Sequence, residues 1–244
     1  MKRKKIGVLG GMGSQATSVY FNRVVEQTEV KNDQDHIDMI ILNHASLPDR
    51  TEVILTNREE TFLEPIKKDI QLLTDANVDY IAMTCNTAHY FFDLLQATTS
   101  VPMINMVEET LKLIEQHYGR GSKVGILATD GTIVCHTYQN MCERYGMIPH
   151  APNETIQQQT MDLIYRVKAD EEVDAGQLET IIHHLMVEEK CDCVILACTE
   201  LSCINIGSTF NKHTIDAMDA LVGSTIRLAG GKLKSSVLPY EKIK

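Results

Sequence analysis

The segment VDYIAMTCNT, residues 78–87, runs from an aliphatic stretch into a cysteine that is followed by two polar residues. A second segment, CDCVILACTE, residues 191–200, has the same plan. Asp192 stands where Asp79 does in the first segment, and both segments carry a cysteine at the eighth position. Continuous apolar runs closed by turn-forming residues are typical of buried parallel strands. Both segments are therefore predicted to be core strands that end just before a cysteine.

Another pair of segments matches further upstream in each half of the chain. KKIGVLGGMG, residues 4–13, resembles SKVGILATDGT, residues 122–132: a basic residue, an apolar run containing a glycine, then small and polar residues. The interval from the lysine before each run to the cysteine of its half is 80 residues in the first half and 75 in the second. Two landmarks in the same order indicate that the halves are duplicates of one another.

Strand-like and helix-like patterns alternate along both halves. Segments such as residues 62–76 and 176–190 have the apolar spacing of amphipathic helices. Alternating strands and helices indicate parallel sheets covered by helices. The predicted class is α/β, with two similar Rossmann-like lobes, each a parallel sheet flanked by helices, and the active site in the cleft between them. We expect one lobe to span residues 1–104 plus 217–244, with a returning C-terminal helix, and the other 105–216.

Composition narrows the classes of function. The chain has 244 residues, is 43% hydrophobic and carries a formal net charge of −10. Such an acidic balance argues against a nucleic-acid partner. No apolar run is long enough to span a bilayer, so no membrane partner is expected. Seven cysteines without an export signal indicate reduced thiols, and the predicted location is cytoplasmic.

Cys85 and Cys198 are the two candidate reactive residues. Ligands of parallel α/β sheets sit outside the carboxyl ends of the strands, where both cysteines are predicted to lie. Each is expected to precede a helix whose N-terminal dipole lowers the thiol pKa. If the lobes face each other across a pseudo-twofold axis, both sulfurs reach one cleft. The alternative is ordinary packing, because cysteine is among the most buried residue types.

The remaining cysteines are interpreted as structural. Their spacing around Cys198 does not match a zinc knuckle, so no metal site is expected. The residues interpreted in this way are Cys135, Cys142, Cys191, Cys193 and Cys203.

Six motifs together resemble the aspartate racemase branch of the aspartate/glutamate racemase family: in order, GGMGSQAT, LPDRT, TCNTAH, ATDGT, YRVK and ACTE. The resemblance covers nearly the whole chain. Glutamate racemases typically have Thr-His after the second cysteine, whereas this chain has Thr199-Glu200, which favours the aspartate branch. The resemblance implies no cofactor and a homodimer. It also implies that Cys85 and Cys198 form the acid/base pair, and that Arg50 and Lys168 bind the substrate's carboxylates.

The chemistry of racemisation fits this residue set. One group must remove the α-proton while another delivers a proton to the opposite face, and a thiolate with a thiol can do both. Arg50 has a fork that can bind two carboxylate oxygens. Glu200 is expected either to orient the ammonium group or to interact favourably with its own helix dipole. The further residues predicted to contact substrate are Met12, Asn86, Thr87, Thr129, Thr199 and Glu200.

Alternatives remain at this stage. Arg50 can instead be a surface residue paired with Asp49, Lys168 a solvated helix lysine, and Asn86, Thr87 and Thr199 helix caps. The loop GGMGSQAT lacks the spacing of a nucleotide-phosphate loop. The predicted function is a cofactor-independent aspartate racemase. The alternatives are a glutamate or broad-specificity racemase and a non-catalytic amino-acid-binding protein.

Overall fold

The computed structural model describes residues 3–235 and contains two four-stranded parallel sheets. The first has the order β2-β1-β3-β4 and the second β6-β5-β7-β8, so the strand order is the same in both. The predicted two-lobed α/β class is confirmed. The strands are β1 Ile6–Gly10, β2 Met39–Asn43, β3 Tyr80–Met83, β4 Met103–Ile104, β5 Lys123–Leu127, β6 Ile148–His150, β7 Cys193–Leu196 and β8 Thr214–Asp216.

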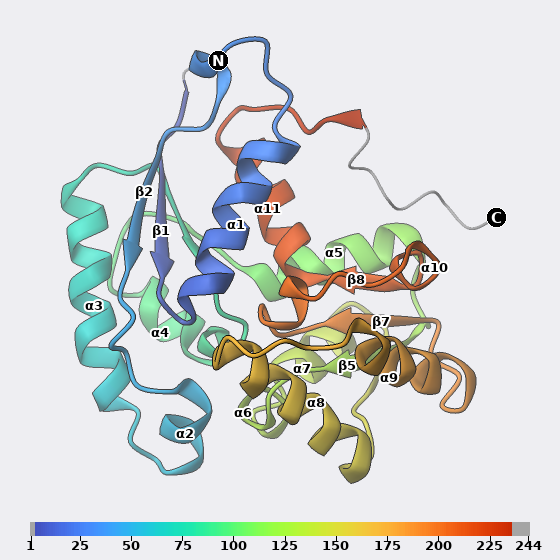
Figure 1. Cartoon of the computed structure of the whole chain (residues 1–244). Coiled ribbons are helices and arrows are strands. Elements are labelled where there is room, and N and C mark those ends of the chain that lie inside the picture. Colours follow the sequence, from blue (N-terminus) through green and yellow to red (C-terminus); the bar gives the residue numbers. More distant parts are fainter. Residues whose placement is uncertain (1–2, 236–244) are drawn as a thin grey trace.

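Helices connect the strands and cover the sheets (Figure 1). The α-helices are α1 Ser14–Gln27, α2 Arg50–Leu55, α3 Glu60–Asp75, α4 Phe92–Gln96, α5 Met106–His117, α6 Asp130–Val134, α7 Thr137–Arg144, α8 Glu154–Lys168, α9 Ala175–Val187, α10 Ser208–Asn211 and α11 Ala217–Leu228. Short 3₁₀ helices within residues 3–235 are η1 Asp33–Asp35, η2 Thr87–Phe91 and η3 Leu201–Cys203. Within residues 3–235, none of the helices has both the length and the apolar character that a bilayer crossing needs.

The repeated motifs make the same hydrogen bonds in both lobes. The Lys5 amide donates to the Asp79 carboxylate at 2.7 Å, and the Lys123 amide donates to the Asp192 carboxylate, also at 2.7 Å. In both lobes the aspartate amide returns a bond to the carbonyl of the same lysine. Each aspartate therefore ties the start of the third strand of its lobe to the start of the first. The matched sequence positions are structural equivalents.

The helices that follow β4 and β8 are exchanged between the lobes. α5 leaves the first sheet and packs against α7 and β8 of the second. α11 leaves the second sheet and packs against α1, β3 and β4 of the first, and α5 and α11 also pack on each other. Figure 1 shows α11, in red, beside α1, in blue. Both exchanged helices begin at a capping side chain, Asn105 for α5 and Asp216 for α11.

The last helix, α11, thus packs against strands of the first sheet, as expected from the sequence. The division of the chain into domains at residues 104 and 216 stays a prediction. The tail of the first predicted lobe, residues 236–244, lies outside the described residues, as do residues 1–2.

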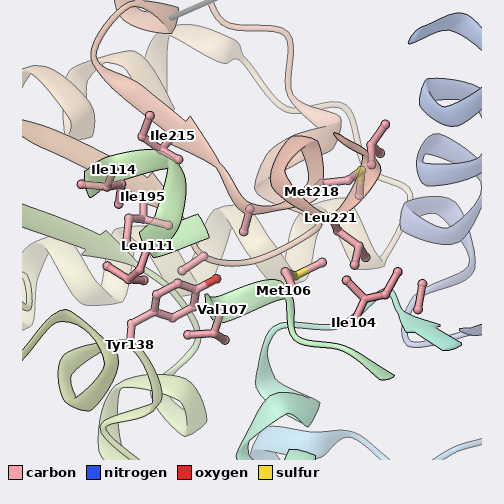
Figure 2. Packing of buried hydrophobic residues seen from close by; sticks show 14 of the residues in the cluster. Ile104, Met106, Val107, Leu111, Ile114, Tyr138, Ile195, Ile215, Met218 and Leu221 are labelled. Atoms are coloured by element: carbon pink, nitrogen blue, oxygen red, sulfur yellow. The ribbon is translucent and has the colours of Figure 1, made fainter. Parts of the chain in front are cut away.

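One apolar core runs through both lobes. Alternate strand residues point to opposite faces of a sheet, and Val8 of β1 and Ile195 of β7 face this shared core. Figure 2 shows its centre, where Tyr138 lies among side chains of α5, β7, β8 and α11. The opposite faces pack on separate clusters, one with α3 and one with α8 and α9. The shared core therefore joins the two sheets into one body.

Candidate active site

A small cavity lies where the carboxyl ends of the two sheets meet. Its volume is about 10 Å³, roughly the room that one water molecule needs. Both lobes contribute to its wall, which contains all ten residues predicted from the sequence and two that were not, Asp49 and Thr51. The wall residues are Met12, Asp49, Arg50, Thr51, Cys85, Asn86, Thr87, Thr129, Lys168, Cys198, Thr199 and Glu200.

The two cysteines occupy equivalent positions in the two lobes. Cys85 lies two residues beyond the end of β3, and Cys198 lies two residues beyond the end of β7. Both are buried, with 5% and 4% of their surface exposed, and both line the cavity. The duplicated fold therefore brings two thiols from distant parts of the chain to one small space.

The segments after the cysteines differ from the expectation of two helix N-termini. A five-residue 3₁₀ helix, η2, follows Cys85 and leads into α4. Only the three-residue η3 follows Cys198. A helix this short adds little to the aligned peptide dipoles that stabilise an anion. The expected lowering of the thiol pKa by a helix dipole is wrong for Cys198: burial and the neighbouring Glu200 carboxylate raise the pKa of this thiol well above its ordinary value.

Cys198 is held as a hydrogen-bond donor. Its S–H group donates to Glu200 Oε2 at 2.9 Å, and the Thr199 hydroxyl donates to the same oxygen at 3.4 Å. Glu200 Oε1 has no hydrogen-bond partner among residues 3–235 although it is buried. It lies close to the backbone of Gly13, whose added Cβ would come within 3.5 Å of it.

Arg50 is the cation beside Cys85. It is the first residue of α2, after the Asp49 cap. Its guanidinium donates to the Pro48 carbonyl and to the Met12 carbonyl, each at 2.9 Å. Burial lowers the pKa of Arg50, but the charges of Cys85 and Asp49 outweigh burial and raise it. Only 6% of Arg50 is exposed, so the surface alternative is wrong.

Lys168 ends α8 and reaches the cavity from the second lobe. Its ammonium group donates to Asp49 Oδ2 at 2.8 Å and lies 4.6 Å from the centre of the Tyr165 ring. Burial lowers the pKa of Lys168, but Cys198 and Asp49 raise it overall. The alternative of a solvated lysine is therefore wrong. Asp49 was considered only as a surface partner of Arg50, although it precedes Arg50 directly in LPDRT.

Two amide and hydroxyl clusters cross between the lobes. The Tyr138 hydroxyl donates to Asn86 Oδ1 at 2.5 Å, and Asn86 Nδ2 has no acceptor within the described chain. Thr87 and Thr129 hydroxyls are 2.9 Å apart, and the Thr132 hydroxyl donates to Thr87 at 3.2 Å. Sequence reasoning missed Tyr138, because nothing in its local sequence distinguishes it from an ordinary core tyrosine.

The glycine-rich loop after β1 forms the floor of the site through its backbone. Gly11 has φ +88°, and a Cβ there would come within 2.4 Å of the His44 carbonyl carbon. This close approach explains why residue 11 is a glycine. The carbonyl of the next residue, Met12, accepts a hydrogen bond from Arg50. Met12 itself is buried.

No metal centre is evident in the described part of the chain. Over residues 3–235, no group of three or more His, Cys, Asp or Glu side chains is arranged to hold a metal ion. His89, the histidine nearest Cys85 in sequence, is a buried core residue. Its Nδ1 donates to the Cys85 carbonyl at 2.7 Å, and its Nε2 accepts from the Met106 amide at 3.0 Å.

Known proteins resemble the chain in sequence and in fold. A family model described as Asp/Glu/Hydantoin racemase matches residues 9–225. The broad specificity amino-acid racemase RacX of Bacillus subtilis is 28% identical over 232 residues, which cover 91% of this chain and 96% of that protein.

Two solved structures resemble the chain in fold, to different degrees. The aspartate racemase of Picrophilus torridus has a TM-score of 0.82 and 29% identity, covering 97% of this chain and 99% of that one. A glutamate racemase of Francisella tularensis has a TM-score of 0.63 and 17% identity, covering 100% of this chain and 86% of that one. At that lower identity the likeness concerns the fold alone.

Proposed function

Because the chain belongs to the Asp/Glu/hydantoin racemase family, we propose that it is a cofactor-independent racemase of aspartate, with Cys85 and Cys198 as its acid/base pair. The observation that supports this most is the presence of both thiols, from equivalent positions in duplicated lobes, in the wall of one cavity. Opposed thiols are what a two-base proton exchange at an α-carbon needs.

The two sulfurs have different roles in the resting enzyme. Cys198 keeps its proton, donates a hydrogen bond to Glu200 and is the acid. Cys85, beside the Arg50 guanidinium, is the base. The Cys85 thiolate removes the α-proton, and Cys198 delivers its own proton to the opposite face of the carbon. Turnover leaves Cys85 as a thiol and Cys198 as a thiolate, which is ready for the reverse reaction.

Cationic and hydrogen-bond-donating groups stabilise the charge that develops on the substrate. The α-proton of an amino acid is very weakly acidic, so the carboxylate must be stabilised as electron density moves onto it. Arg50 and the unpartnered Asn86 Nδ2 are donors for this carboxylate. Lys168 acts later in the reaction. Its positive charge stabilises the Cys198 thiolate once that thiolate forms, since the two charges interact.

Substitution of either thiol tests the proposal. We expect Cys85→Ser and Cys198→Ser each to lower aspartate racemisation by about 10²–10⁴-fold, because a serine hydroxyl is a poor acid or base at neutral pH. Chiral chromatography and α-deuterium exchange in D₂O, on protein free of pyridoxal phosphate, measure the effect. Cys135→Ser is the matched control, since Cys135 is outside the cavity wall.

Wild-type turnover in both cavity variants would contradict the two-thiol mechanism. The experiment also separates the mechanism from the substrate, because a panel of L-amino acids can be run on the same proteins. A homodimer, implied by the family resemblance, and a cytoplasmic location, predicted from the cysteine content, belong to the same proposal, and sedimentation equilibrium measures the first of them.

A broad-specificity racemase is the second candidate. The similarity to a protein named as such over 91% of this chain supports it. Racemisation of neutral amino acids at rates equal to that of aspartate would favour it. Strong preference for aspartate would favour the first candidate.

A further inference from the structure

The cavity wall contains an acidic side chain, Asp49, that the racemisation chemistry does not use. We propose that Asp49 tunes the substrate range: by neutralising Lys168 it weakens the binding of amino acids with an acidic side chain relative to neutral ones. The inference rests on the proposed racemase function and concerns the substrate class of the same site. It predicts that a substrate with an acidic side chain must compete with the Asp49 carboxylate for Lys168.

The position of the Asp49 carboxylate is fixed from two sides. Oδ2 accepts from Lys168 at 2.8 Å, across the junction of the lobes. Oδ1 accepts from the Glu52 amide at 3.1 Å and so caps α2, while the Tyr165 hydroxyl lies 3.4 Å from the same oxygen. Rotating the carboxylate away would leave the first turn of α2 uncapped. Asp49 is therefore a fixed negative charge in the wall.

The ion pair is partly buried. The side chains of Asp49 and Lys168 are 26% and 21% exposed. Burial by itself raises the pKa of Asp49, but Lys168 reverses the direction and lowers it. Asp49 is thus ionised when the site is empty and stands where a substrate carboxylate would otherwise meet Lys168.

The ion pair between Asp49 and Lys168 affects substrate binding because the cavity wall contains few charged side chains. Arg50 and Lys168 contribute the two cationic side chains, and Asp49 and Glu200 the two acidic ones. Arg50 donates to backbone carbonyls and remains available for one substrate carboxylate. A second carboxylate on an acidic side chain must share Lys168 with Asp49, and like charges this close repel strongly in a partly buried site.

The substitution Asp49→Asn isolates the charge from the cap. Asparagine has almost the same shape and is as good an N-cap as aspartate, so α2 is retained. Lys168 then has no carboxylate partner of its own and can bind that of the substrate. We expect the ratio of kcat/KM for aspartate to kcat/KM for alanine to rise about tenfold, mainly through a lower KM for aspartate.

Lys168 must be the group through which Asp49 acts. In a Lys168→Met background, the further change Asp49→Asn is therefore expected to leave the aspartate/alanine ratio unchanged. A double-mutant cycle over these two positions measures the coupling directly. Asp174→Asn is the matched control: it also removes one negative charge from an N-cap, that of α9, outside the cavity wall.

The outcomes separate the inference from the function on which it rests. A wild-type protein that racemises neither amino acid overturns the proposed function, and the inference with it. An active wild type whose aspartate/alanine ratio is the same in Asp49→Asn overturns the inference alone. An equal fall in kcat/KM for aspartate and for alanine also overturns the inference, because Asp49 would then affect both substrates alike.

Discussion

At the residue scale, the two cysteines are equivalent by fold but differ in chemistry. Cys85 lies beside the Arg50 guanidinium, whereas Cys198 donates to the Glu200 carboxylate and has a raised pKa. Their positions at the strand ends are the same, so the difference comes entirely from neighbours. Under the proposed mechanism, this difference in neighbours assigns the acid role to Cys198 and the base role to Cys85 at the start of the reaction.

His89 offers a stability test at the same scale. Burial lowers its pKa from 6.5 to about 4, so the unfolded chain binds a proton at pH values where the folded chain does not. The free energy of unfolding is therefore expected to fall as pH decreases from 6.5 to about 4, by up to about 3 kcal/mol from this residue. Urea unfolding at several pH values measures the slope.

Substitution of His89 measures how much this residue contributes to the pH dependence of the free energy of unfolding. His89→Gln is expected to unfold more easily at neutral pH, because the Cys85 and Met106 backbone partners cannot both be kept, but to lose part of the acid dependence. The exposed His183 provides a control, and His183→Gln should retain the wild-type slope. An unchanged slope in His89→Gln would rule out the buried neutral state.

At the element scale, the contact between α7 and the start of η2 orients a donor in the site. The Tyr138 hydroxyl donates to Asn86 Oδ1, which turns Asn86 Nδ2 away and leaves it without a partner in the described chain. Tyr138 is thus a positioning residue that acts through Asn86. Its ring is fully buried in the shared core, so the orientation depends on the packing of α7 (Figure 2).

Removing only this hydroxyl tests the role of Tyr138. Tyr138→Phe retains the ring and is expected to raise KM and lower kcat/KM about tenfold, since the Asn86 amide loses the bond that fixes it. Steady-state kinetics separates KM from kcat. In an Asn86→Ala background the same change should have no further effect, and an additive loss there would mean that Tyr138 acts by another route.

At the scale of the whole molecule, the exchanged helices make the lobes depend on each other. α5 and α11 pack together and each covers the sheet of the opposite lobe. The shared core spans both sheets, whereas the outer clusters belong to one lobe each. Opening of the small cavity for substrate must therefore be accommodated around this common core.

We expect the two lobes to unfold in one transition for this reason. Leu221→Ala, in α11 at the shared core, should lower the free energy of unfolding by about 2–5 kcal/mol and shift both lobes together. Urea titration followed by circular dichroism and by mass-resolved labelling of Cys85 and Cys191, which lie in the outer clusters of the first and second lobe, reports the lobes separately. Two separated transitions would show that the lobes fold independently.

The duplicated strands and the cysteine at each strand end could be predicted because they depend on local patterns, whereas Lys168 was predicted only through the family resemblance. Apolar runs of strand length and matched motifs are visible in single segments such as 78–87 and 191–200. Asp49 and Tyr138 could not be given their roles, since each acts through a residue of the opposite lobe. The 3₁₀ turn after Cys198 was also missed, because its apolar spacing resembles the start of a helix.

Local composition and spacing were enough to identify two α/β halves and the cysteine at each strand end, because burial and strand periodicity act over a few neighbouring residues. The charged groups that lie beside the two sulfurs were decided by the folded structure. Hydrogen bonds and ion pairs depend on distances of a few ångströms, and the chain reaches those distances only when its lobes are packed together. For that reason Lys168 meets Asp49 only across the junction of the lobes, whereas Cys198 reaches Glu200 two residues further along the chain.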